Sequence, residues 1–119
     1  MVLYDSRGEA IAYCENGKDI FLFDGRPVAY FTGEYVYTYD GHQLGTFVDG
    51  WLRDNDGYCV LFTERAQGGP VTPVTHIVPI KRVKHVVPIR HVRDVARISP
   101  TRKNGWSNLS AATFFGVGR

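Results

Sequence analysis

Cysteine and long apolar runs are scarce in this 119-residue sequence. The two cysteines, Cys14 and Cys59, are too few for a disulfide scaffold and form no C-x-x-C pair, so we expect two reduced structural thiols. No apolar run approaches the ~20 residues that a membrane-spanning helix needs, and residues 1–7 lack the apolar stretch of a signal peptide. We therefore expect a single cytoplasmic globular protein without a cofactor.

Aromatic and acidic residues are almost missing from the second half of the chain. No aromatic occurs between Thr63 and Gly105. Residues 1–63 carry four basic and ten acidic side chains, a net charge of −6, whereas residues 64–119 carry ten basic and two acidic ones, a net charge of +8. This division predicts a β module at 1–63, an extended basic arm at 64–103 and a docking segment at 104–119.

Residues 1–63 contain an internal repeat built on turn glycines. Gly8, Gly25, Gly41 and Gly57 are separated by 17, 16 and 16 residues. Three columns recur around them: an aromatic four residues before the glycine (an arginine in the last unit), an aliphatic three after it, and a Tyr, Thr or Phe five after it. In that order the columns are Tyr4, Phe21, Tyr37 and Arg53; Ile11, Val28, Leu44 and Val60; and Tyr13, Tyr30, Thr46 and Phe62.

The repeat predicts four tandem β-hairpins. Asp-Gly, present at three of the four glycines, is preferred in tight hairpin turns because these require positive φ. Further glycine turns fall midway between the units, at Asn16-Gly17, Thr32-Gly33 and Asp49-Gly50. The spacing of two between the aliphatic column and the column after it is a strand period, which places both on one face. We expect an all-β fold of eight short strands, petal-like or barrel-like, because closure hides strand edges.

From residue 71 the chain has a period of three. A β-branched aliphatic stands at every third position, and five prolines share the phase just before it. A strand would turn such a stripe to both faces and an α-helix would wind it around the axis. The pattern therefore predicts a polyproline II arm, with a long 3₁₀-helix as the rival. The predicted packing stripe consists of Val71, Val74, Ile77, Ile80, Val83, Val86, Ile89, Val92, Val95 and Ile98.

The arm is too long to lie straight on its own module. As polyproline II, Val71 to Ile98 would span roughly 85 Å, whereas a compact 63-residue body is about 30 Å across. The arm must bend around the module, cross onto a neighbouring subunit, or remain partly loose. We expect inter-subunit packing, and hence a homo-oligomer, because the aliphatic stripe requires cover.

The end of the chain predicts a short helical segment capped by Ser107. Its apolar side chains could anchor the segment on the module or on a partner. These predicted anchors are Trp106, Leu109, Phe114 and Phe115.

Two binding functions are alternatives to self-assembly. The basic arm could bind nucleic acid or another polyanion, although it has no aromatic residue on which a base could stack; the candidate contacts are Lys81, Arg82, Lys84, Arg90, Arg93 and Arg97. Aromatic repeats could also bind saccharides, although a small module needs most of its aromatics for its own core; the available rings are Tyr4, Tyr37, Tyr39 and Trp51.

Metal binding and catalysis have weak support in the sequence. His76, His85 and His91 share one phase of the arm, but ~3.1 Å per residue separates them by about 28 and 19 Å, too far to share a metal ion. The segment 54–57 begins like a calcium loop and lacks its spacing and distal glutamate. His42 has no Ser or Cys partner in a recognisable motif. We expect neither a metal site nor an enzyme.

Several motifs taken together resemble one bacterial family. These are the repeated Asp-Gly-x-x-(Val/Leu)-(Ala/Gly), the run at 41–50, the junction at 66–70 and the ending at 106–110. As a set they resemble the 4-fold beta flower proteins over essentially the whole chain. The resemblance implies four β petals followed by an extended, proline-rich arm, and it implies no activity. Many arm positions at which the resemblance implies proline hold a polar residue in this sequence. These residues are His76, Arg82, His85, His91, Asp94 and Arg97.

The sequence therefore predicts a non-enzymatic structural or interaction protein. Its arm would pack on the β module of its own or of neighbouring subunits to form an assembly.

Overall fold

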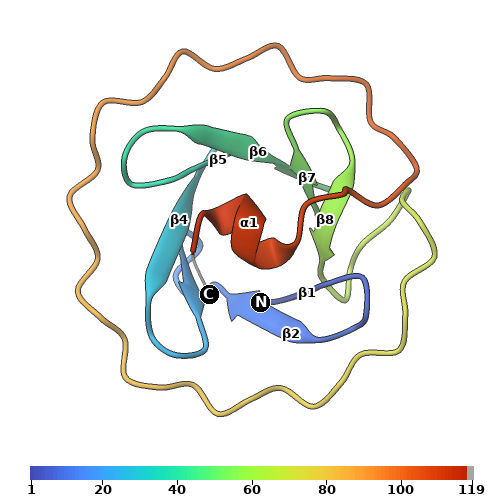
Figure 1. Cartoon of the computed structure of the whole chain (residues 1–119), viewed down its shortest axis with the longest axis horizontal. Coiled ribbons are helices and arrows are strands. Elements are labelled where there is room, and N and C mark those ends of the chain that lie inside the picture. Colours follow the sequence, from blue (N-terminus) through green and yellow to red (C-terminus); the bar gives the residue numbers. More distant parts are fainter. Residues whose placement is uncertain (118–119) are drawn as a thin grey trace.

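Eight short strands form a closed antiparallel barrel in sequence order (Figure 1). The computed structural model describes residues 1–117, so the last two residues of the predicted docking segment lie outside the described part. The barrel confirms the predicted all-β fold of eight strands. The strands are β1 (Val2–Tyr4), β2 (Ala10–Tyr13), β3 (Asp19–Leu22), β4 (Pro27–Thr32), β5 (Tyr35–Tyr37), β6 (Gln43–Val48), β7 (Trp51–Asp54) and β8 (Cys59–Phe62).

The four hairpins β1–β2, β3–β4, β5–β6 and β7–β8 are the four petals, and a β-bulge recurs at the same place in each of them. In the first, Leu3 pairs with Ala12 and Tyr4 with Ala10, which leaves Ile11 without a partner across the strand pair. The bulge places the aliphatic and the small residue after it in one interior cluster. The expectation that the aliphatic column shares a face with the column two residues later is wrong, because Tyr13 packs in a separate outer cluster. The four bulged residues are Ile11, Val28, Leu44 and Val60.

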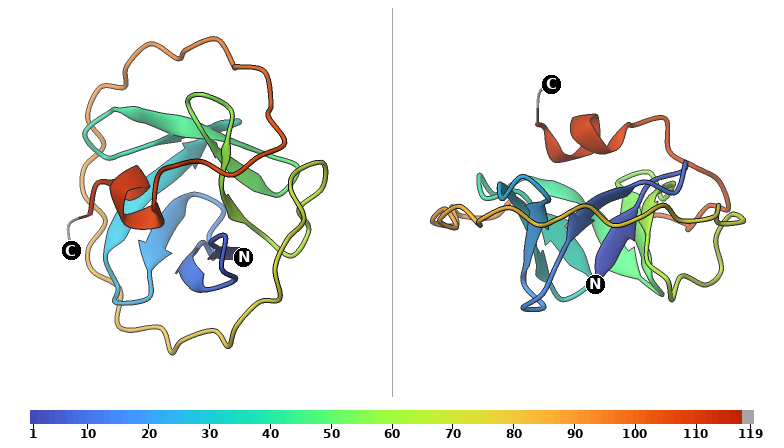
Figure 2. Two further views of the ribbon diagram at one scale, coloured as in Figure 1. Left: turned by 45° about the vertical axis from the view of Figure 1, so that its right-hand side comes forward. Right: turned by 90° about the horizontal axis from the view of Figure 1, so that it is seen from below.

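The C-terminal segment covers one end of the barrel. Helix α1 (Ala111–Phe115) lies over the barrel's middle in Figure 1 and above one end in the side view of Figure 2. Phe114 and Phe115 are buried in the interior cluster. Ser110 caps the helix by accepting the Thr113 N–H at 3.1 Å, so the prediction that Ser107 is the cap is wrong.

The predicted arm at 64–103 contains neither helix nor strand; after the turns at 64–70, residues 71–103, called the arm from here on, run around the outside of the barrel as a ring (Figure 1). In the side view it stays at one level of the barrel (Figure 2). The length mismatch is therefore resolved by bending of the arm around its own barrel, one of the three alternatives. Inter-subunit packing of the arm stays a prediction. None of the described helices has the length and apolarity to cross a membrane.

The petal glycines permit this close approach. Gly8, Gly25 and Gly41 have φ between +84° and +100°, a range that L side chains rarely adopt. A Cβ on each would also strike an arm carbonyl oxygen, that of Val74, Val83 or Val92 respectively. Glycine is therefore required at these turns for two independent reasons.

We predict that Gly41→Ala is much more damaging than Gly33→Ala. Gly33 has φ +60° and open space where a Cβ would lie, so the control should lose about 1 kcal/mol of unfolding free energy. Gly41→Ala adds a collision with the arm and should lose about 3 kcal/mol. Urea unfolding measures both, and protease cleavage within residues 71–103 should rise only for Gly41→Ala. Equal losses would show that the arm does not rest on this turn.

Candidate functional site: the arm seam and the outer belt

Four cross-strand pairs face outward beneath the arm, and we call them sectors 1 to 4. Sector 1 pairs Phe62 with Tyr4, and this is also the pair that closes β8 onto β1. Sectors 2 to 4 are Tyr13 with Phe21, Tyr30 with Tyr37, and Thr46 with Arg53. The paired rings in the first three sectors have centroids 5.5 to 6.1 Å apart. Aromatic pairs thus occupy three of the four sectors.

The arm places cations over the rings of sectors 2 and 3. Lys81 Nζ lies 4.9 Å from the Tyr13 ring centroid and Lys84 Nζ lies 5.4 Å from that of Phe21. In sector 3, the guanidinium carbon of Arg90 is 4.0 Å from the Tyr30 centroid. These distances are those of cation–π interactions, which are stronger where water is partly excluded.

Arg93 completes the arrangement in sector 3, and Val87 lies between the two sectors. The Arg93 guanidinium carbon is 5.7 Å from the Tyr37 centroid. Val87 packs against the aromatic clusters of both sectors. The contacting arm residues therefore follow a nine-residue repeat, in which Lys81, Lys84 and Val87 of one sector correspond to Arg90, Arg93 and Ala96 of the next.

Sector 4 differs from sectors 2 and 3 because the barrel itself supplies a cation. Arg53 is 3% exposed and its Nε donates to the Gly57 carbonyl at 3.1 Å. The arm residue equivalent to Lys81 and Arg90 is Ser99, which lines a small hollow with Arg53. Arg102, equivalent to Lys84 and Arg93, lines the same hollow. Sector 1 has no arm cation, because Thr72 and Thr75 stand at the equivalent positions. The pattern of cations thus distinguishes one register of the arm from registers shifted by nine residues.

Backbone hydrogen bonds fix the arm to each petal turn. The N–H groups of His76, His85, Asp94 and Lys103 donate to the carbonyls of Gly8, Gly25, Gly41 and Gly57, at 2.8 to 3.1 Å. These donors are nine residues apart along the arm, whereas the acceptors are 16 or 17 apart along the barrel. Arg82 and His91 donate in the same way to Phe23 and Tyr39. Proline has no N–H to donate, which explains why these positions depart from the proline pattern.

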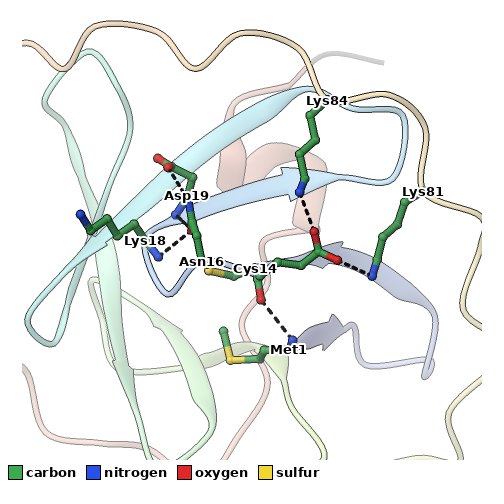
Figure 3. Close-up of polar contacts among 8 residues, drawn as sticks. Met1, Cys14, Asn16, Lys18, Asp19, Lys81 and Lys84 are labelled. Atoms are coloured by element: carbon green, nitrogen blue, oxygen red, sulfur yellow. Dashed lines mark hydrogen bonds and ion pairs between the residues drawn. The ribbon is translucent and has the colours of Figure 1, made fainter.

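A pair of ionic contacts reinforces sector 2. Lys81 and Lys84 both reach the carboxylate of Glu15, at 2.8 and 2.5 Å, as Figure 3 shows for the two lysines. Hydrogen bonds from Lys81 and Lys84 lower the pKa of Glu15 to about 2. Nothing in the sequence singled out Glu15, although the opposite net charges of residues 1–63 and 64–119 are consistent with such pairs.

A buried polar cluster joins sectors 2 and 3. The Tyr39 hydroxyl donates to Asp19 Oδ1 at 2.8 Å, and Arg90 Nη2 lies 3.5 Å from the same oxygen. Burial and the adjacent Asp19 carboxylate raise the pKa of Tyr39. Burial alone would raise the pKa of Asp19, but hydrogen bonds from Tyr39 and Asn16 and the charge of Arg90 lower it. Asp19 therefore stays ionised and holds the arm by a partly buried charge.

The ten aliphatics of the arm point away from the barrel. These residues are 86–95% exposed, and the arm that carries them forms the outermost circumference of the molecule (Figure 1). We call these residues, Val71, Val74, Ile77, Ile80, Val83, Val86, Ile89, Val92, Val95 and Ile98, the outer belt. The expectation that the barrel of the same chain could cover them is wrong. Of the three positions in each triplet of the arm, one contacts the barrel rings and one donates its backbone N–H to the barrel, so the third, aliphatic position faces outward.

The remaining predicted residues are dispersed or buried. All six candidate polyanion contacts are exposed. Four of them, Lys81, Lys84, Arg90 and Arg93, also lie over barrel rings, whereas Arg82 and Arg97 do not. The four rings considered for saccharides are all buried. Residues 1–117 contain no group of three or more potential metal ligands. His42 lies on the surface, with Nδ1 3.3 Å from Asp94 of the arm.

The predicted C-terminal anchors divide into two groups. Trp106 packs edge-on against Trp51 and Phe62, and Phe114 and Phe115 enter the interior. Leu109 is 42% exposed and is no anchor. Ser107 donates to Asp54 Oδ2, which ties the segment to β7. Hollows of about 450 and 370 Å³ flank this segment, and both have mixed polar and apolar walls.

Both cysteines are free and buried. Burial raises the pKa values of the Cys14 and Cys59 thiols, which keeps them in the unreactive protonated form.

We predict that Glu15→Gln removes part of the acid sensitivity of the fold. The pKa of Glu15 is depressed from 4.5 to about 2, so its contribution to stability is complete above pH 4.5 and is lost as the pH falls towards 2. The melting temperature of the wild type should therefore fall more steeply over this range than that of Glu15→Gln. Glu9→Gln, outside the ion pairs of the described residues, should retain the wild-type slope. Parallel curves for all three proteins would contradict the prediction.

A second prediction concerns register. Ser99→Arg brings a guanidinium beside Arg53 and should lower the unfolding free energy by on the order of 1 kcal/mol. Thr72→Arg places the same side chain near the rings of sector 1 and should be neutral or stabilising by about 0.5 kcal/mol. Urea unfolding of the two variants compares them directly. A loss of equal size in both would show that the cation pattern does not select the register.

Comparison with known proteins gives one match. The family model described as "4-fold beta flower protein" matches residues 1–115. No curated protein and no solved structure matches the chain. The match spans the four petals, the arm and the C-terminal segment, and it confirms the resemblance noted in the sequence. The chain therefore belongs to the 4-fold beta flower protein family.

Proposed function

We propose that this chain is a non-enzymatic structural protein that assembles with other copies of itself through the outer belt. One observation carries the proposal: ten β-branched aliphatics stand almost fully exposed on the circumference. Isolated exposed aliphatics are ordinary, but a continuous series of them is typical of an interaction surface. Covering ten such side chains is worth on the order of 15–30 kcal/mol in total.

The seam with the barrel supports this role, because it gives the belt a fixed shape. Backbone hydrogen bonds at the four petal turns and cation–π contacts in two sectors restrain the arm. A restrained surface loses less conformational entropy on binding than a loose arm would. The alternative of polyanion binding has less support, since four of its six candidate cations lie over barrel rings.

We also propose that the arm has the polyproline II conformation. Three observations support it: one phase contacts the rings, the second donates backbone N–H groups, and the third is the outer belt. Three residues per turn is the conformation that keeps three such faces separate over many residues.

We predict that replacing the six belt valines with threonine abolishes assembly. The substitution keeps the side-chain shape and replaces a methyl with a hydroxyl at Val71, Val74, Val83, Val86, Val92 and Val95. In sedimentation velocity over a concentration series, the wild type should form species larger than 13.4 kDa and the variant should remain monomeric. Circular dichroism should show unchanged folding, because these residues are almost fully exposed.

The control replaces exposed apolar side chains that lie off the belt. Val78→Thr combined with Leu109→Thr removes side chains that are 38% and 42% exposed, and it should assemble like the wild type. A wild type that stays monomeric at every concentration would refute self-assembly through the belt.

A further inference from the structure

The outer belt, if it is the self-assembly surface proposed above, imposes a geometry on the assembly. We propose that copies associate edge to edge into an open layer one molecule thick, rather than into a closed dimer. The occupant of the belt is then a second copy of this chain at each side. The argument rests on the shape, the extent and the repeat of the belt.

The belt is convex, which limits what any one neighbour can cover. The molecule measures 36 × 35 × 26 Å, and the ring follows its wide circumference (Figures 1 and 2). Belt side chains follow one another at ~9 Å along the arm, so a second convex edge touches roughly three of them. At about 100 Å² each, these give roughly 300 Å² per side. A stable pair needs about 800 Å² per side, so one neighbour is insufficient.

The belt extends over several petals, which allows several neighbours. The Val74, Val83 and Val92 carbonyls pass over the turn glycines of the first three petals. Their side chains therefore occupy successive quarters of the circumference. In the fourth petal the equivalent residue is Thr101, and the belt has already ended at Ile98. Contacts in three directions of one plane are enough to extend a layer.

The chemistry of the belt fits a second copy. All ten belt side chains are Val or Ile, so the belt itself offers apolar contact only, and exposed charged residues such as Arg82 and Arg97 lie beside it on the arm. Another belt repeats the same ~9 Å step, and the side chains of one edge can enter the gaps of the other. Since the ring stays at one level of the barrel, belt-to-belt contact keeps neighbouring barrels in one plane (Figure 2).

Cross-linking from two separated quarters tests this geometry. The full-length double variant Val74→Cys with Val92→Cys is treated with a short bismaleimide at a concentration where the wild type assembles. A layer should give a ladder of trimers, tetramers and larger products on a denaturing gel. A closed dimer should stop at two chains. The wild type is the control for reactivity, because Cys14 and Cys59 are buried.

Atomic force microscopy of the wild type gives a second reading. A layer should appear as flat patches with a height near the short dimension of 26 Å. Products that stop at two chains, without patches, would overturn the layer and leave belt-dependent assembly standing. A wild type that is monomeric in sedimentation would instead overturn the assembly on which the layer rests.

Discussion

The hydrogen bonds from the arm to the petal turns determine the outer surface of the molecule. Each joins an arm N–H to the carbonyl of a turn glycine, and the arm carbonyl two residues earlier passes over the same glycine. This contact recurs at Gly8, Gly25 and Gly41, with a closely similar one at Gly57. Because nine arm residues advance by one petal, the remaining two phases are then oriented as well. One faces the outer rings and the other faces solvent.

The energetics of the seam follow from this orientation. The outer aromatic pairs would be a large exposed apolar surface without the arm, and the arm's cations would lack partners without the rings. Together they form an interface in which Asp19 and Glu15 supply the negative charge. The exposed belt is the consequence on the opposite side of the arm, since a chain with three faces cannot turn all of them inward.

Much of this architecture was predictable from sequence periods. The 16-residue glycine repeat indicated eight strands and four petals, and the period of three indicated an extended arm with a separate aliphatic face. The bulges were not predictable, because the spacing in the sequence does not show that Ile11 is left unpaired and packs against the same interior cluster as Ala12. Bending of the arm was one of three alternatives, and chain length alone could not choose among them because it does not reveal curvature. A comparison of Lys81 with Arg90 and of Lys84 with Arg93 contained that signal, as a nine-residue period matched to the petals.

The outer aromatic pairs also have a consequence for synthesis of the chain. The strands of the barrel are complete at Phe62, while the arm that covers Tyr13, Tyr30 and Tyr37 begins only after the junction at 64–70. A nascent chain therefore passes through a stage in which the petals can close while their aromatic exterior still faces water. During that interval the ribosome-bound intermediate exposes an apolar surface that the arm covers in the finished protein. The rate at which residues 71–103 emerge therefore determines how long the intermediate is prone to aggregation.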